Sequence, residues 1–476
     1  MGYKQVDAAD LAALIEICGA SRVRAARDLS ADYAHDAMIG LRQMPEVMVE
    51  PVSTHEVSAI LRYAYERAIP VTARGQGTGL AGGAVPLQGG ILLNLCRMNR
   101  VLDLDEENLT LTVEPGVLLA DIYTLVEQHD LFYPVNPGQK CATIGGNVAT
   151  NAGGMSAVKY GVTRDYVRGL EVVLADGDVI QTGGKIGKNS SGYSLKDLLV
   201  GSEGTLGIVT KIVLRLLPLP RHTATLLAAF VGLPEAVRAV PEIIKAKVNP
   251  RALEFVEPDF VHAAETYLGI GQNSPFFFPN VADATGIGAY LLLMLDGCSI
   301  EAIEQERDRA VRAIQESGAL GVDICDAQRS TEIWRARGAF VDAIQASTSQ
   351  MEQCDLVVPR TELAEFVVYA RKLQEKFGVR IKTFGHAGDG NLHIYVLRDQ
   401  LDQDDWSRRL SLVFDCLYRR AEELGGQVSG EHGIGYAKRK FLEETAGVAV
   451  MDVMRKIKAA MDPKGILNPG KIVYYP

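Results

Sequence analysis

Two patterns of apolar and polar positions divide this chain. In its first part, short apolar and β-branched runs bounded by polar turns predict strands at 70–73, 91–95, 101–104, 109–113, 170–175, 179–180 and 207–217. A helix is expected at 55–70, where four apolar residues share one helical face: Val57, Ile60, Leu61 and Ala64. Residues 1–45 also look helical and lead into this β-rich part.

Turn signals join several of these strands. The polar turn Asp105–Asn108 lies between two strand-like runs, and Asp176-Gly177 lies between two others. Asp-Gly between apolar runs is a strong hairpin signal, and a polar turn between two strand-like runs is a hairpin signal as well. We therefore expect hairpins at both places. Pro218-Leu219-Pro220 then interrupts the pattern, and we expect a domain boundary there.

From about residue 222, apolar strand-like runs alternate with charged helices. Strands are expected at 224–231, 289–295, 355–359, 380–384 and 394–397, and helices at 234–247, 300–317, 361–377 and 406–424. Such alternation predicts an α+β second domain. The chain thus divides into residues 1–221, residues 222–424 and a C-terminal segment, 425–476.

The composition is that of a globular protein. Hydrophobic residues make up 47% and charged residues 23%, and the net charge of −10 argues against a nucleic-acid groove. The seven cysteines are dispersed without a C-x-x-C motif, which argues against a disulfide framework, a zinc ribbon or an iron–sulfur cluster. No signal-peptide pattern and no apolar run of about 18 residues is present. We therefore expect a cytoplasmic protein without a membrane span.

Four glycine-rich segments of the first part indicate a ligand site. They are Arg74–Gly83, Thr143–Gly154, Asn189–Tyr193 and Gly201–Val209. Glycine lacks a Cβ and permits positive φ, so its backbone N–H groups can wrap a diphosphate closely, with Arg74 as a cationic partner. A purely structural loop is the alternative for any one segment, and the lysine-ended P-loop pattern is absent. Four such loops together favour a large flat ligand lying along a sheet.

Two histidine motifs lie near the C-terminus. One is Gly385-His386-Ala387-Gly388-Asp389-Gly390-Asn391-Leu392-His393, and the other is Gly430-Glu431-His432-Gly433. The glycines around Asp389 predict a tight turn that can bring the two flanking histidines together at the mouth of a hairpin. Two histidines and a carboxylate form a ligand set for Zn²⁺, Fe²⁺ or Mn²⁺ with open positions. Buried imidazoles that only satisfy a turn are the alternative.

These motifs together resemble those of FAD-binding oxidoreductases of the vanillyl-alcohol-oxidase / p-cresol-methylhydroxylase superfamily. The similar branch comprises FAD-linked D-lactate dehydrogenase, glycolate oxidase and D-2-hydroxyglutarate dehydrogenase. The resemblance runs from about residue 40 to 472 and includes Glu114-Pro115-Gly116 and Asp462–Lys471. It implies an α+β fold with a two-subdomain FAD-binding domain, completed by the C-terminal segment, and a cap domain with a mainly antiparallel sheet.

The resemblance also implies how FAD is bound. Arg74 to Gly79 would hold the diphosphate, and Glu203 would lie near the adenosine half. No His or Cys occurs in 71–95 and Cys141 is a weak candidate for a covalent link, so non-covalent FAD is expected. The implied cofactor-binding residues are Arg74, Gly75, Gly77, Thr78, Gly79, Pro137, Gly138, Thr143, Gly145, Gly146, Asn151, Gly153, Gly154, Glu203, Gly204, Ile208 and Asn468.

For the reaction, the resemblance implies a divalent metal (Fe, Zn or Mn) on His386, His393 and Glu431, with His432 as general base. A 2-hydroxy acid can chelate the metal, which acts as a Lewis acid, while an imidazole takes the hydroxyl proton. The α-hydrogen then leaves as hydride to flavin N5. Arg337 matches the carboxylate-binding position and Arg335 is the runner-up; a solvated helix face is the alternative for both.

The substrate is expected to be a small monocarboxylate. Hydroxyglutarate dehydrogenases hold a distal carboxylate with Thr and Lys, where this chain has Val341 and Gln353. This favours D-lactate, then glycolate, over D-2-hydroxyglutarate. Electrons would pass to an electron-transferring flavoprotein, an iron–sulfur subunit of a glycolate-oxidase-like complex, or quinone, and a homo-oligomer is compatible with the sequence. A non-enzymatic flavin electron-relay subunit and a metal hydrolase are the competing functions; the complete histidine motifs argue against the first, and the glycine-rich loops against the second.

Overall fold

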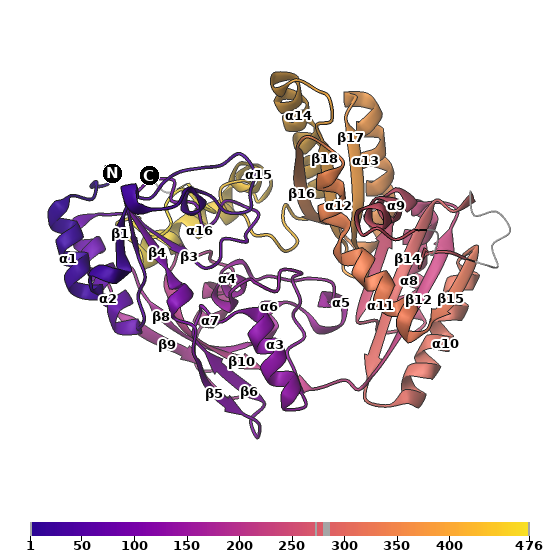
Figure 1. The fold of residues 1–476 in the computed structure, drawn as a ribbon, viewed down its shortest axis with the longest axis horizontal. Helices are drawn as coiled ribbons and strands as arrows, with labels where there is room; N and C mark the ends of the chain where they lie inside the picture. The colour runs from indigo at the N-terminus through magenta and orange to yellow at the C-terminus, as the bar shows by residue number, and fades with distance from the viewer. Residues whose placement is uncertain (1, 272–273, 279–285, 475–476) are drawn as a thin grey trace. The chain divides into compact units, whose positions relative to one another are not determined.

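The computed structural model describes residues 2–271, 274–278 and 286–474, which form two compact units. Unit 1 comprises Met1–Gly153, Gly161–Leu219 and Glu431–Pro476, and unit 2 comprises Gly154–Tyr160 and Pro220–Gly430. In Figure 1, unit 1 runs from indigo to magenta and ends in the yellow C-terminal segment, whereas most of unit 2 is pink to orange. In the described part of the chain, no helix is long and apolar enough to cross a membrane.

Unit 1 is built on two main sheets. The first has the order β1 (Val23–Ala25), β2 (Val47–Val49), β4 (Ile91–Asn94) and β3 (Val71–Arg74), with β2 and β3 both parallel to β4. The second is antiparallel, in the order β5 (Val101–Asp105), β6 (Thr110–Val113), β10 (Ile208–Arg215), β8 (Val167–Val173) and β9 (Val179–Gly183). A short pair joins β7 (Leu131–Phe132) and β11 (Leu217–Pro218). The glycine-rich loop after β3 therefore connects two parallel neighbours.

Helix α2 (Thr54–Arg67) illustrates how the sequence pattern becomes packing in unit 1. Ser53 caps its first turn by accepting from the Glu56 N–H, and Ala68 ends it in the left-handed conformation, with φ of 53°. Its four predicted apolar residues are buried in one core with strands of the first sheet. Full burial of each larger aliphatic side chain contributes about 1.5–3 kcal/mol.

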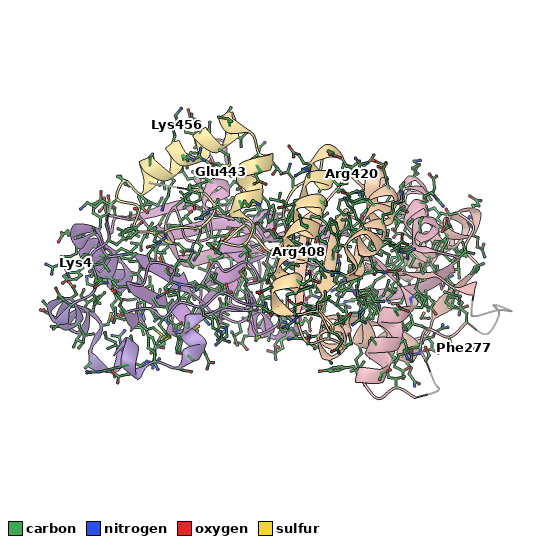
Figure 2. The ribbon with its side chains drawn as sticks, turned by 90° about the horizontal axis from the view of Figure 1, so that it is seen from above. Lys4, Phe277, Arg408, Arg420, Glu443 and Lys456 are labelled. Atoms are coloured by element: carbon green, nitrogen blue, oxygen red, sulfur yellow. The ribbon has the colours of Figure 1, made fainter. Side chains whose placement is uncertain are left out.

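The other α-helices of unit 1 surround these sheets. They are α1 (Ala8–Cys18), α3 (Leu119–Gln128), α4 (Ile144–Thr150), α6 (Thr163–Tyr166), α7 (Leu195–Leu199), α15 (Arg439–Thr445) and α16 (Val448–Met461). Figure 2 labels Glu443 on α15 and Lys456 on α16. Short 3₁₀ turns of unit 1 lie at Ala20–Arg22, Ala26–Asp28, Ala31–Ala34 and Leu95–Arg97.

Unit 2 is built on one seven-stranded antiparallel sheet. Its order is β15 (Gly321–Cys325), β12 (His222–Phe230), β14 (Ala289–Gly297), β13 (Ala252–Val256), β17 (Arg380–His386), β18 (Asn391–Leu397) and β16 (Met351–Val357). One connected layer of helices packs on it: α8 (Leu233–Lys245), α10 (Ile300–Glu316), α13 (Leu363–Phe377) and α14 (Gln403–Glu423). Figure 2 labels Arg408 and Arg420 on α14.

A second group of helices in unit 2 shares an apolar core with the sheet. These are α9 (Pro258–Tyr267), α11 (Ala327–Gly338) and α12 (Phe340–Ala346). The rings of Phe260, Phe340 and Phe384 meet there with centroids 5.2–5.9 Å apart, which fixes α9 and α12 against β17. The short helix α5 (Ala157–Tyr160) contacts β13, and a 3₁₀ turn precedes α13 at Arg360–Glu362.

The α+β architecture expected from the sequence is confirmed, with two local differences. Both predicted hairpins form, as β5–β6 and β8–β9. The N-terminal 45 residues are less helical than expected, because only Ala8–Cys18 forms an α-helix and residues 23–25 form an edge strand. The strand expected at 355–359 begins earlier, at Met351. Glu352 and Gln353 obscure its start, since an edge strand tolerates polar residues.

Candidate active site

Unit 1 contains a pocket of about 1390 Å³, including the part open to solvent. Three of the four glycine-rich segments contribute to its lining, within 73–84, 142–153 and 199–209, together with Glu431 and His432. The remaining glycine-rich segment lies outside the lining, and Tyr193 at its end is 97% exposed. The expectation that four loops serve one ligand is therefore corrected to three.

Several glycines at this pocket have no room for a side chain. A Cβ on Gly75 would lie 2.2 Å from Thr143 Oγ1, and a Cβ on Gly145 would lie 2.5 Å from the Pro115 Cβ. Gly77 has φ of +72°, which L side chains rarely adopt. Bare backbone at these positions allows the close approach that a diphosphate requires.

Asn147 on α4 supplies an unused donor at the pocket. It is 5% exposed, it belongs to the lining, and its Nδ2 finds no hydrogen-bond partner within the described ranges. A buried donor without a partner costs about 1–3 kcal/mol. A bound ligand that presents an acceptor would remove this cost. The glycine cradle and this amide together fit a large polar cofactor such as FAD.

Most of the predicted cofactor-binding residues line the pocket, although Arg74 is partly committed elsewhere. Its guanidinium donates to the backbone carbonyls of His35 and Asp32, at 2.7 and 3.1 Å. Arg74 therefore holds the 32–36 segment beside the pocket, whatever it contributes to a phosphate. The predicted residues in the lining are Arg74, Gly75, Gly77, Thr78, Gly79, Pro137, Thr143, Gly145, Gly146, Gly153, Glu203, Gly204 and Ile208.

Four predicted cofactor-binding residues do not belong to the lining: Gly138, Asn151, Gly154 and Asn468. Asn151 ends α4 in the left-handed conformation, and its side-chain oxygen accepts from the Arg164 N–H. The Asn468 amide donates to the carbonyls of Gly83 and Glu203. These two side chains support the pocket walls from outside.

Glu203 holds the loop that follows Glu431 and His432. Its two carboxylate oxygens accept from the N–H groups of Ile434 and Gly435, at 2.7 and 2.8 Å. Burial raises the pKa of Glu203 to about 7, although these hydrogen bonds and nearby lysines act to lower it. Glu203 is thus a positioning residue for the histidine motif. Glu203 also belongs to the lining of the pocket, and the place near the adenosine half that the resemblance implies for it stays a prediction.

The ionisation of Glu203 should shape the pH dependence of stability. The pKa of Glu203 is about 7 in the folded protein, above the ordinary value of 4.5. Between pH 4.5 and about pH 7, Glu203 therefore keeps its proton in the folded protein but has lost it in the unfolded chain. The free energy of unfolding therefore falls as pH rises through this window. Glu203→Gln should remove this fall. Urea denaturation at about pH 5 and about pH 7.5 measures it, with exposed Glu107→Gln as control; an equal fall in both variants would contradict the assignment.

In unit 2, His386 and His393 lie on adjacent strands around the predicted tight turn. His386 ends β17 and pairs with Asn391 at the start of β18. His393 is two positions further along, so its side chain lies on the same face of the sheet. Their Nε2 atoms are 3.3 Å apart, and the residues are 5% and 4% exposed.

This pair of imidazoles fits a metal ion. Two nitrogens bound at about 2.0–2.1 Å to one tetrahedral ion lie roughly 3.3–3.4 Å apart, which matches the separation of the two Nε2 atoms. Imidazole suits Zn, Fe and other transition metals. Glu431, the third predicted ligand, belongs to unit 1. The residue before it, Gly430, is the last of unit 2 and donates its N–H to Asp355.

Glu254 on β13 is a buried carboxylate that the sequence reading missed. It is 0% exposed and lies opposite His386 in the register of β13 and β17. Its Oε1 is 2.6 Å from His386 Nδ1, and its Oε2 accepts from Arg337 Nε and Nη2 at 2.9 and 2.6 Å. Burial would raise the pKa of Glu254, but His386 and Arg337 bring it below its ordinary value. The sequence does contain one signal for it: a glutamate inside the apolar run Ala252–Val256 indicates a buried carboxylate that needs a partner.

The two candidate carboxylate-binding arginines differ in their surroundings. Arg337 is 9% exposed, and its guanidinium lies 4.6 Å from the ring centre of Phe384. Two of the five N–H groups of Arg337 donate to Glu254, and the others are left as donors for a substrate. Arg335, on the same helix, is exposed.

The two residues considered for substrate selection also lie in unit 2. Val341 packs against the apolar core, and Gln353 Nε2 is 3.1 Å from His393 Nδ1. Neither side chain is a cation that could bind a second carboxylate of the substrate.

Known proteins share both parts of this chain. Residues 45–183 match an FAD binding domain, and residues 219–472 match the C-terminal domain of FAD linked oxidases. A D-lactate dehydrogenase of Anaerostipes hadrus is 43% identical over 95% of each chain. Glycolate oxidase subunit GlcD of Bacillus subtilis is 40% identical over 92% of this chain and 91% of its own.

Among solved structures, p-cresol methylhydroxylase with substrate bound has the same fold. Its TM-score is 0.80 at 18% identity, over 97% of this chain and 96% of that chain. The pocket geometry, the domain matches and the two relatives agree. The chain therefore belongs to the FAD-linked oxidases of the vanillyl-alcohol-oxidase / p-cresol-methylhydroxylase family, with FAD as its cofactor.

Proposed function

We propose that this enzyme oxidises D-lactate to pyruvate with FAD and a divalent metal. The main support for the metal is the pair of buried imidazoles in unit 2, His386 and His393, whose Nε2 atoms are 3.3 Å apart. Relatives named D-lactate dehydrogenase and glycolate oxidase support a 2-hydroxy acid as the substrate. Since Val341 and Gln353 offer no cation for a second carboxylate, D-lactate is preferred to D-2-hydroxyglutarate, with glycolate as the alternative.

Each predicted residue has a chemical task in this proposal. His386, His393 and Glu431 would hold Zn, Fe or Mn, which when bound supplies a Lewis acid for the substrate hydroxyl. Arg337 would bind the substrate carboxylate through the donors that Glu254 leaves available. His432 would accept the hydroxyl proton on an imidazole nitrogen. FAD supplies the hydride acceptor.

We further propose that FAD is held without a covalent bond and that its electrons leave through a protein partner. The described residues that line the pocket include no cysteine, and their one histidine is His432. All seven cysteines are free, which supports a reducing compartment such as the cytoplasm. The chain has no cysteine cluster for an iron–sulfur relay of its own. An electron-transferring flavoprotein or an iron–sulfur subunit is therefore the proposed acceptor.

Anaerobic reduction of the bound flavin tests this function. D-lactate should bleach the flavin absorbance faster than L-lactate, glycolate or D-2-hydroxyglutarate. Removal of the metal by a chelator should slow bleaching by at least about 100-fold, since Lewis-acid stabilisation is worth several kcal/mol, and added Zn²⁺ or Mn²⁺ should restore it. Acid precipitation of the same preparation should release the flavin.

Other outcomes of this experiment would contradict particular parts of the proposal. Undiminished bleaching after verified metal removal would refute the role of the metal. A faster reaction with D-2-hydroxyglutarate would overturn the substrate. Flavin that no 2-hydroxy acid reduces would favour an electron-relay subunit. Yellow colour that stays on the precipitated chain would refute non-covalent binding.

A further inference from the structure

Four polar side chains form a row across the sheet of unit 2. Glu254, His386, His393 and Gln353 lie on β13, β17, β18 and β16, which are consecutive strands of the sheet. Glu254 is opposite His386, and Gln353 is two positions from the residue opposite His393. Three of the four are at least 95% buried, and Gln353 is partly buried. Each neighbouring pair in this row is within hydrogen-bond distance.

Donor and acceptor roles in these contacts depend on the tautomer of each ring, and the chemistry of the partners favours one assignment. The carboxylate of Glu254 can only accept, so His386 Nδ1 carries the hydrogen and its Nε2 presents a lone pair. A hydrogen bond between the two Nε2 atoms, which lie 3.3 Å apart, would then place the hydrogen of His393 on Nε2. His393 Nδ1 is left as an acceptor, which the amide nitrogen of Gln353 satisfies at 3.1 Å.

A metal ion requires a different arrangement at His393 alone. Both Nε2 atoms must then present lone pairs to the ion, so the hydrogen of His393 must move from Nε2 to Nδ1. The ring remains neutral, and no proton is gained or lost. Gln353 can follow this change because its amide has an acceptor oxygen as well as donor N–H groups, so a half-turn presents Oε1 to the new Nδ1–H.

We propose that Glu254 and Gln353 are the positioning residues of the metal site, an inference that rests on the proposed metal. Glu254 holds His386 permanently in the metal-binding tautomer. Gln353 stabilises one tautomer of His393 in the metal-free protein and the other after metal loading. Carboxylate and amide partners behind metal-binding histidines set ring orientation, and their loss typically lowers metal affinity about 10–100-fold.

Nitrogen-15 NMR of histidine-labelled protein tests the tautomers directly. The chain has eight histidines, and His386→Asn and His393→Asn variants assign the two resonance sets. In the metal-free protein, His386 should be protonated on Nδ1 and His393 on Nε2; after addition of Zn²⁺, both should be protonated on Nδ1. A metal-free His393 already protonated on Nδ1, or a zinc-loaded protein with an unchanged His393, would overturn the proposal.

Substitutions separate this proposal from a merely structural role. Gln353→Leu should lower Zn²⁺ affinity about 10–100-fold. Gln353→Glu, which can only accept, should place His393 in the Nδ1–H tautomer before metal is added. In Glu254→Gln, Arg337 should take the amide oxygen, so that the NH₂ group faces His386 Nδ1 and forces the hydrogen to Nε2. Glu352→Gln is the control, because Glu352 lies on β16 but on its opposite face.

Calorimetric Zn²⁺ titration of the metal-free protein, with circular dichroism to verify folding, completes the test. Wild-type protein that binds no metal at all would refute the proposed function. Wild-type protein that binds Zn²⁺, with Gln353 and Glu254 variants that bind it equally well and keep wild-type tautomers, would leave the function standing and refute this inference. Should Glu254→Gln fail to fold, the Gln353 variants still decide.

Discussion

Replacing His432 with asparagine should slow reduction of the bound flavin by D-lactate about 10²–10⁴-fold, the usual contribution of a positioned general base. His432 lines the FAD pocket of unit 1, and its side chain is 15% exposed. Asparagine is polar and smaller than histidine but cannot accept a proton at physiological pH. Stopped-flow absorbance under anaerobic conditions measures the rate. FAD occupancy and metal content should stay at wild-type values.

Two further variants make this result specific. His129→Asn changes an exposed histidine of the same unit, paired with Glu106, and should leave the rate unchanged. Glu431→Gln changes the neighbouring residue and should lower metal affinity, which His432→Asn should not. If His432→Asn kept a rate within about threefold of wild type, a different group would have to take the proton.

The sequence predicted those parts of the site that local pattern determines. The hairpin around Gly388-Asp389-Gly390 follows from turn chemistry between two apolar runs, and it forms with both histidines on one face. The glycine-rich segments around Gly75 and Gly145 follow likewise from the residue type that a close backbone approach needs. In each case residues close together along the chain determine the local backbone conformation.

What the sequence did not reveal depends on pairing between distant segments. Glu254 meets His386 through the strand register of β13 and β17, 132 positions apart, and no local pattern specifies that register. Glu203 reaches the backbone of Ile434 across 231 positions, so that a residue expected at the cofactor also supports the histidine loop. The loop at 189–193 has a glycine and small polar residues, as the flavin loops do, but it is exposed. Composition thus indicates what a loop can do, whereas topology decides which loops face the ligand.

Arg337→Met should have the largest effect on stability, lowering the free energy of unfolding by about 3–5 kcal/mol. Glu254 is 0% exposed, and Arg337 satisfies one of its two oxygens with two hydrogen bonds. Without the guanidinium, a buried carboxylate loses its strongest partner while its desolvation cost stays. The same change removes the proposed carboxylate anchor, so kcat/KM for D-lactate should fall as well. Urea denaturation followed by tryptophan fluorescence reports on unit 2, which contains both tryptophans, Trp334 and Trp406.

The double variant Arg337→Met/Glu254→Gln distinguishes loss of a charge partner from loss of packing. A neutral glutamine needs no guanidinium, and its oxygen can still accept from His386 Nδ1–H. Most of the stability lost in the single variant should therefore return, because a buried ion pair can often be replaced at little cost when both partners change together. A double variant as unstable as Arg337→Met would show that the arginine acts through packing on Phe384 instead.

Arg335→Met completes this comparison, because it changes the exposed arginine of the same helix. Its unfolding free energy should stay within about 0.5 kcal/mol of wild type, and its KM for D-lactate should not change. The double variant recovers the fold without the guanidinium and thereby separates stability from binding. If it keeps the wild-type metal content and its kcat/KM for D-lactate stays low, the substrate carboxylate is assigned to Arg337. A loss of kcat/KM in Arg335→Met would transfer that role to Arg335.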